Sequence, residues 1–259
     1  MSLPRFFLEK QVLSREHEEV FALALSKDDA KHAAVLRLEP GEHIAVIDAQ
    51  QDYFECEVQS FDQALFVKIA RHAQAEVRGP EVVLLQGLCK GDKMDLVIRH
   101  ATELGVSQFV PLLCKRSVVK LDAKKTASRL QRWQTIAKSA AMQSGQNRIP
   151  EVLAPMNCAQ AAKLMESADA LFVCWEEERQ TNLPEAMADL KARVQNDCSC
   201  AKVFVAIGPE GGFAEEEVQA LQACCSHSFS ISLGPSILRT ETAGIVAPAL
   251  VLYELGGLQ

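Results

Sequence analysis

The sequence predicts an α/β protein built on a mainly parallel sheet with helices on both faces, preceded by a small β-rich domain. In the C-terminal two thirds of the chain, short continuous apolar runs alternate with amphipathic segments of helical length, which is the pattern of buried parallel strands joined by helices. In the first 75 residues, runs of β-branched and aromatic residues alternate with polar ones between turn residues. That pattern is typical of a small antiparallel sheet or barrel.

In the N-terminal part, we expect strands around one helix. Ser26 can cap a helix that continues to Leu36, and Pro40-Gly41 is a turn signal. The strands are expected at residues 3–8, 43–48, 53–60 and 65–71. A polar stretch and Gly79-Pro80 follow, so we divide the chain into domains 1–75 and 76–259.

In the second domain, we expect strands at residues 82–88, 106–113, 170–175, 203–207 and 229–233. Helices are expected from about residues 92, 183 and 214, and over 126–143 and 241–255. Ligands of parallel sheets collect at the carboxyl ends of the strands. Three sequence features fall there: Trp175-Glu176, the glycine-rich segment 207–213, and the polar segment 233–243.

Composition excludes several classes of protein. With 48% hydrophobic and 24% charged residues, the chain is globular rather than disordered. No apolar stretch approaches the roughly 20 residues that span a bilayer. The apolar run before Glu9 is too short for a signal peptide. We therefore expect a cytoplasmic protein. The nine cysteines are irregularly spaced without a C-x-x-C pair, which favours reduced thiols and no structural metal.

The net charge of −7 hides a strong asymmetry. Residues 76–150 carry 13 basic and 6 acidic side chains, a balance of +7, whereas the segments before and after it are acidic. A solvated helical face would account for part of this. A cationic segment within an acidic protein also indicates a polyanionic partner such as RNA.

The glycine-rich segment Ile207-Gly-Pro-Glu-Gly-Gly-Phe213 joins a predicted strand to a predicted helix. Such loops often bind phosphate, but the helix opens with Glu215-Glu216-Glu217, which would repel a pyrophosphate. The Walker motif and G-x-G-x-x-G are also absent. A neutral or cationic ligand such as S-adenosylmethionine fits better, and a tight turn without any ligand is the alternative.

The second loop places Arg239, Thr240, Glu241 and Thr242 between two apolar runs at the start of the last helix. A polar cluster at a strand end is where a ligand site is expected. Alternatively, Glu241 complements the helix N-terminus and pairs with Arg239.

Together, Ile-Gly-Pro-Glu-Gly-Gly at 207–212 and Leu-Gly-Pro-Ser-Ile-Leu-Arg-Thr-Glu-Thr-Ala at 233–243 resemble the RsmE-type ribosomal RNA uracil-N3 methyltransferases of the SPOUT superfamily. Further matches at Arg5-Phe6-Phe7, Glu103-Leu-Gly-Val106 and Asn147-Arg-Ile-Pro150 extend the resemblance over nearly the whole chain. It implies a PUA-like, RNA-binding β-barrel at 1–75, a SPOUT-like domain with a C-terminal trefoil knot at 76–259, and a homodimer. It also implies S-adenosylmethionine as cofactor and 16S ribosomal RNA, free or in the small-subunit particle, as partner.

The resemblance implies three groups of site residues. Arg239 is the expected catalytic residue, since its guanidinium suits the charge that develops on uracil O2 and O4 when N3 loses its proton. Glu241 is expected either to take that proton or only to orient Arg239. The expected cofactor-binding residues are Trp175, Gly208, Glu210, Gly211, Gly212, Ser232, Leu233, Gly234, Ile237 and Leu238. The expected RNA contacts are Arg5, Arg37, Lys90, Lys93, Lys115, Arg116 and Arg148.

The chain departs from the family pattern at a few positions. Met142-Gln143 and Gln146 stand where relatives often have a Glu-Gln pair and an arginine, and Ser236 stands at a frequent arginine position. Two other functions fit the same sequence. One is ribose 2′-O methylation by an enzyme of the same superfamily, and the other is a non-catalytic RNA-binding factor in ribosome assembly.

Overall fold

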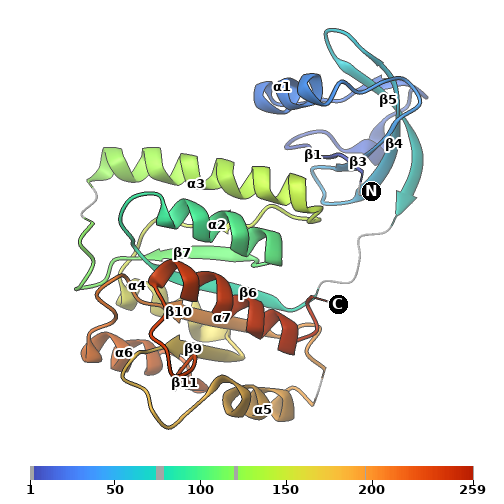
Figure 1. Ribbon diagram of the computed structural model, residues 1–259. Helices are drawn as coiled ribbons and strands as arrows, with labels where there is room; N and C mark the ends of the chain where they lie inside the picture. Colours follow the sequence, from blue (N-terminus) through green and yellow to red (C-terminus); the bar gives the residue numbers. More distant parts are fainter. Residues whose placement is uncertain (1–2, 74–78, 120–121, 196, 259) are drawn as a thin grey trace. The chain divides into compact units, whose positions relative to one another are not determined.

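The computed structural model describes residues 3–73, 79–119, 122–195 and 197–258, and the chain forms two compact units (Figure 1). The first unit comprises residues 1–77 together with 141–148, and the second comprises residues 78–140 and 149–259. The domain boundary expected between residues 75 and 76 falls outside the described residues.

The first unit contains a five-stranded sheet in the order β1-β3-β4-β5-β2. The central strands β3, β4 and β5 are antiparallel, as predicted, but β1 joins β3 in parallel. The two-residue β2 was not predicted, because two residues carry no periodicity. The helix α1 (Lys27–Leu36) begins as predicted after Ser26, whose hydroxyl accepts a hydrogen bond from Asp29 N at 3.1 Å. The strands are β1 (Arg5–Phe7), β2 (Phe21–Ala22), β3 (His43–Ile47), β4 (Tyr53–Phe61) and β5 (Leu65–Ala73).

Met142 belongs to this first unit, where it packs against the buried core formed by residues such as Phe6 and Phe54. The methionine, which the resemblance marks as a departure, is thus in apolar surroundings.

The second unit contains a six-stranded sheet in the order β11-β9-β10-β6-β7-β8, and all of its strand pairs are parallel. This confirms the predicted parallel sheet and all five predicted strands; the two-residue β8 was not predicted. The strands are β6 (Glu81–Gly87), β7 (Gln108–Leu112), β8 (Glu151–Val152), β9 (Ala170–Cys174), β10 (Lys202–Ile207) and β11 (Ser228–Ile231).

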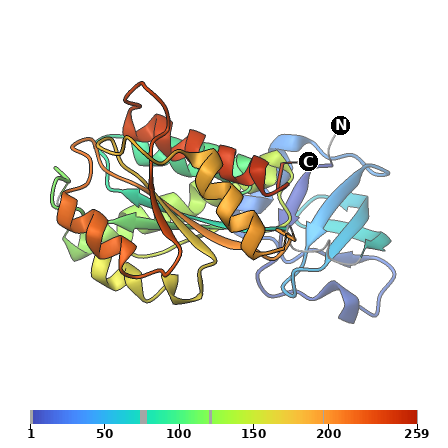
Figure 2. The same cartoon turned by 90° about the horizontal axis from the view of Figure 1, so that it is seen from below.

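Helices cover both faces of this sheet, as predicted (Figures 1 and 2). Side chains of a strand alternate between its faces. Val82 and Leu84 of β6 therefore belong to the core under α2, α3, α5 and α7, whereas Val83 and Leu85 belong to the core under α4 and α6. The helices are α2 (Lys93–Leu104), α3 (Ala123–Ser144), α4 (Cys158–Ala162), α5 (Leu183–Arg193), α6 (Glu215–Gln222) and α7 (Thr240–Glu254). Of these, the five-residue α4 was not predicted.

The helix α7 packs unusually close to the sheet and to α2. A β-carbon on Gly244 would lie 2.3 Å from Gln86 Oε1 of β6 and 3.1 Å from Val97 Cγ1 of α2. Gln86 and Val97 are both fully buried, so neither neighbour can move into solvent. The contact fixes the position of α7 along β6.

Gly244→Val should therefore lower the free energy of unfolding by about 1–3 kcal/mol, the usual cost of overpacking a core. Urea unfolding followed by circular dichroism would measure it. Gly79→Val is the control, because a β-carbon on Gly79 meets nothing within 4 Å. Equal stability of the two variants would show that α7 is not held this closely.

Candidate functional site

A pocket of about 970 Å³ lies at the carboxyl edge of the parallel sheet, where the chain leaves β9, β10 and β11. Its volume is that of a site for a small molecule or cofactor. Polar and glycine-rich loop residues form most of its wall. The lining residues are Lys93, Cys174–Glu176, Glu178, Arg179, Ile207–Gly212, Ile231–Thr240 and Ala243.

The loop between β10 and α6 turns sharply against the pocket. Gly212 has a φ of +70°, and its N–H donates to Pro209 O at 2.9 Å. The Glu176 carboxylate lies against it, so that a β-carbon on Gly212 would lie 1.9 Å from Glu176 Oε1. The positive φ therefore strains any residue with a side chain at this position, and such a side chain would also displace the Glu176 carboxylate.

A carboxylate in the first turn of α6 accepts hydrogen bonds from the protein's own backbone. The buried Glu217 carboxylate accepts the N–H of Ala214 at 3.0 Å and the N–H of Lys115 at 2.8 Å. It thereby joins the glycine-rich loop to the loop that follows β7.

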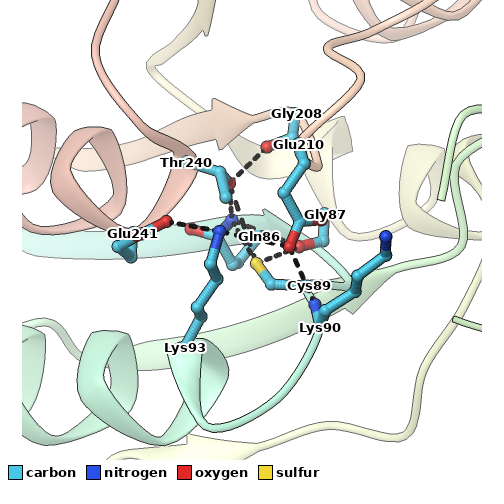
Figure 3. A network of polar contacts seen from close by, with 9 residues as sticks. All are labelled: Gln86, Gly87, Cys89, Lys90, Lys93, Gly208, Glu210, Thr240 and Glu241. Atoms are coloured by element: carbon cyan, nitrogen blue, oxygen red, sulfur yellow. Dashed lines mark hydrogen bonds and ion pairs between the residues drawn. The ribbon is translucent and has the colours of Figure 1, made fainter. Parts of the chain in front are cut away.

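The first turn of α7 is tied to the same loop by a buried hydrogen-bond relay (Figure 3). Gln86 Nε2 donates to Thr240 Oγ1 at 2.9 Å, and Thr240 Oγ1 donates to Gly208 O at 2.6 Å. Gln86 is completely buried and Thr240 is buried. The relay connects the end of β6, the first residue of α7 and the first glycine of the loop.

Charged groups connect the same elements nearer the surface. Lys93 Nζ lies 3.3 Å from Glu210 Oε1 and 3.1 Å from Glu241 Oε2. Glu210 Oε1 also accepts the N–H of Lys90 at 2.9 Å. Burial opposes ionisation of Glu241, but a backbone N–H and the Lys93 ammonium outweigh it, so that the pKa of Glu241 lies below its ordinary value.

Arg239 is the N-cap residue of α7; it is exposed and lines the pocket. Within the described part of the chain, no carboxylate forms an ion pair with its guanidinium. Its charge lowers the pKa of Glu241 only through space. The donors of Arg239 are thus free to meet a bound molecule.

The loop after β9 is stiffened by Glu178. Its carboxylate accepts the N–H groups of Gln180, Arg179 and Thr181 at 2.7, 2.9 and 3.1 Å, and these bonds, that of Gln180 foremost, lower the Glu178 pKa. The bond from Ser232 N to Thr181 O, at 3.0 Å, joins this loop to the one after β11. The Trp175 indole nitrogen is buried without an acceptor among the residues that the structure describes.

The structure thus places all ten predicted cofactor residues, and Arg239, around one pocket. Glu241 lies one layer behind it, against Lys93. What these side chains bind stays a prediction.

The predicted RNA contacts are not brought together in the same way. Lys93 is held inside the pocket by two carboxylates, Lys115 is paired with Glu216, and Arg116 donates to Gly211 O at 3.1 Å. Only Lys90 extends its side chain away from the network (Figure 3). Arg5, Arg37 and Arg148 belong to the first unit, where Arg5 bonds to Gly145 O and Asn147 Oδ1.

The structure also places Gln86 and Arg179, which were not predicted, beneath and in the pocket, together with Glu176 and Thr240, which were expected near a ligand site without a specific role. Gln86 offered a signal, since it is the one polar side chain within the apolar run 82–88. Arg179 gave none, because its position depends on how the loop after β9 folds.

The described residues show neither a disulfide nor a membrane-spanning helix. All nine cysteines are free, and the residues described contain no group of three or more metal-ligating side chains. Over the same residues, every helix is too short or too polar to cross a membrane.

Similar proteins identify the family of the chain. Residues 77–252 match the model of a family described as an RNA methyltransferase domain. The chain is 34% identical to the ribosomal RNA small subunit methyltransferase E of Bacillus subtilis, with 97% of each chain covered. It is 30% identical to the Mycobacterium bovis protein of that name, over 85% of this chain and 82% of the other.

Solved structures of similar proteins support the same family. A ribosomal RNA small subunit methyltransferase E from Neisseria gonorrhoeae, bound to S-adenosyl methionine, superposes with a TM-score of 0.77 at 29% identity, covering 96% of this chain and 97% of the other. A Legionella pneumophila protein in complex with the same cofactor gives 0.78 at 27% identity, with 98% of each covered. The chain therefore belongs to the RNA methyltransferase family, together with the ribosomal RNA small subunit methyltransferases E.

Proposed function

We propose that the protein transfers a methyl group from S-adenosylmethionine to N3 of a specific uridine in small-subunit (16S) ribosomal RNA, in the cytoplasm. The observation that carries the proposal is Arg239, an exposed guanidinium at the mouth of a pocket that the two motif loops enclose. The names of the relatives support the class of RNA, and the two cofactor-bound neighbours support the methyl donor.

The pocket residues fit this cofactor. The acidic Glu210, which lines the pocket, suits a sulfonium, and the glycine-rich loop has no lysine or serine placed to hold a phosphate. The buried Trp175 indole N–H has no acceptor among the described residues, so it is able to donate to a bound molecule. When bound, the cofactor supplies an electrophilic methyl group on sulfur. We propose that the loops 208–212 and 232–238, with Trp175, hold it.

Arg239 acts on the RNA base. Uracil N3 is a nucleophile only after its proton leaves, and the negative charge then spreads to O2 and O4. The guanidinium presents several donors in a planar fork to those oxygens. Because N3 is on the Watson–Crick edge, the target base must be unpaired or flipped into the pocket.

Glu241 suits the orienting role better than that of a base. Its lowered pKa makes the carboxylate a weak proton acceptor, and the Lys93 ammonium already occupies it. We therefore propose that Glu241 orients the first turn of α7 and, with it, Arg239.

We also propose contacts between the RNA backbone and basic residues outside the pocket. The first unit, which joins the proposed PUA-like barrel of residues 1–75 to residues 141–148, would bind the RNA backbone through Arg5, Arg37 and Arg148. In the second unit, within the proposed SPOUT-like domain of residues 76–259, the exposed candidates are Lys90, Lys115 and Arg116. Phosphate contacts of this kind would make binding salt-dependent.

The trefoil knot and the homodimer are part of the same proposal. The knot is supported by the path of the chain, which runs from β11 at one edge of the sheet back to α7 on β6 and α2. The homodimer is supported by the outer face of α7, which is apolar like its inner face and exposes Leu250 and Tyr253 at 43% and 63%. A helix that is apolar all round is normally buried.

Replacing Gly212 tests the cofactor site. Gly212→Val should abolish S-adenosylmethionine binding in calorimetry with the fold retained, since the turn cannot keep its shape. Gly256→Val is the control, because Gly256 has a φ of +79° but open space at the far end of α7. A folded Gly212→Val protein with wild-type cofactor affinity would place the cofactor elsewhere.

Replacing Arg239 tests the reaction. Arg239→Ala should lower the single-turnover rate on the order of 100- to 1,000-fold, the usual effect of removing one such donor, with little change in cofactor affinity. Arg239→Lys should recover little, and higher pH should partly rescue the alanine variant. The methylated atom is mapped by mass spectrometry.

Two results would count against this assignment. A variant with a lower melting temperature but wild-type turnover would mean that Arg239 only holds α7. A methyl group found on the ribose of the product would replace the N3 assignment by 2′-O methylation, and no transfer by the wild-type protein would favour a non-catalytic assembly factor.

A further inference from the structure

We propose that Lys93 is a positioning residue of the methyl-transfer site: its ammonium bridges Glu210 of the glycine-rich loop and Glu241 of α7, and so holds Arg239 in place over the cofactor loop. The inference rests on the proposed function for its link to catalysis. It replaces the prediction from sequence that Lys93 contacts RNA phosphate.

The bridge joins three elements that are distant in sequence (Figure 3). Lys93 is the first residue of α2, Glu210 follows β10, and Glu241 is in the first turn of α7. The Lys93 Nζ atom lies 3.3 Å from the first carboxylate and 3.1 Å from the second. The three side chains are 29%, 25% and 18% exposed, so water competes only in part for these contacts.

One end of the bridge is fixed independently of Lys93. Glu210 Oε1 accepts the N–H of Lys90, and Gly208 is held by the Thr240 relay. Glu241, in contrast, has no other ion-pair partner among the described residues. The Thr240 relay already ties the first turn of α7 to Gly208, and Lys93 adds a second tie, from the Glu241 side chain of that turn to Glu210 of the same loop.

The local charge argues against a role of Lys93 in binding phosphate. Two carboxylates surround one ammonium, so the cluster is negative and would repel an RNA phosphate that approached Lys93. The carboxylate of Glu241, and then that of Glu210, raise the pKa of Lys93 against the effect of burial, so its charge is retained for the bridge. Lys90 lies three residues earlier in the same segment, and its exposed side chain points away from the cluster.

Lys93→Met keeps most of the length and the apolar stem of the side chain but removes the ammonium, and Lys90→Met is the matched comparison. Hydrogen exchange measured by mass spectrometry tests the bridge without any substrate. We expect faster exchange in peptides that cover residues 208–213 and 239–245 of Lys93→Met, and wild-type exchange there in Lys90→Met. Unchanged exchange in Lys93→Met would overturn the bridge, whatever the protein's activity.

Turnover then tests the link to catalysis. Small ribosomal subunits from cells lacking the gene serve as substrate, with radiolabelled S-adenosylmethionine. At saturating RNA, Lys93→Met should lower the single-turnover rate on the order of 10- to 100-fold, as expected for a misplaced catalytic group, while the RNA Kd stays within twofold. Lys93→Arg, whose fork can reach both carboxylates, should restore part of the rate.

The opposite pattern would contradict the proposal. If Lys93→Met weakened RNA binding as Lys90→Met is expected to do, and kept the wild-type rate at saturation, Lys93 would be a phosphate contact. If the wild-type protein transferred no methyl group, the proposed function would fail, but altered exchange in Lys93→Met would still support the bridge.

Discussion

The hydroxyl of Thr240 is the contact on which the site depends most. It donates to Gly208 O and accepts from Gln86 Nε2 in a fully buried setting, so that one side chain joins a strand end, a glycine-rich loop and a helix start. A buried polar group left without its partner costs about 1–3 kcal/mol, which keeps the three elements together. Arg239 is the chain neighbour of Thr240, so the contact also fixes where Arg239 leaves the loop at the pocket.

The charged side chains near that relay differ in how far they are exposed and paired. The carboxylates of Glu210 and Glu241 are partly buried and paired with Lys93, whereas the Arg239 guanidinium is exposed at the pocket. A cationic methyl donor and a base that becomes anionic would each meet groups of opposite charge in this arrangement. The negative net charge of the protein is thus compatible with RNA as substrate, because the charges that matter are local.

Much of the fold could be predicted from the sequence because its signals are local. Continuous apolar runs located all five principal strands of the parallel sheet, and Ser26 located the start of α1. The parallel pairing of β1 with β3 and the short β2, β8 and α4 could not be predicted, because pairing partners and two-residue strands leave no periodic pattern. Met142 stood out in the sequence as a departure from the expected pattern, and the structure shows that its side chain packs against the core of the first unit.

The candidate site was predictable to a different degree. Both motif loops reach one pocket because strands of a parallel sheet end at the same edge. The role of Lys93 could not be predicted, since a lysine at a helix start looks the same whether it faces RNA or two carboxylates. Gln86 and Thr240 act through a contact 154 residues apart in sequence, which only the folded chain reveals.

The most direct measurement of the central claim is nucleoside analysis of small-subunit ribosomal RNA by mass spectrometry, from cells with and without the gene. The account predicts that 3-methyluridine disappears in the deletion strain and returns when the wild-type gene is restored. An unchanged 3-methyluridine content, or the loss of a 2′-O-methylated nucleoside in its place, would contradict it.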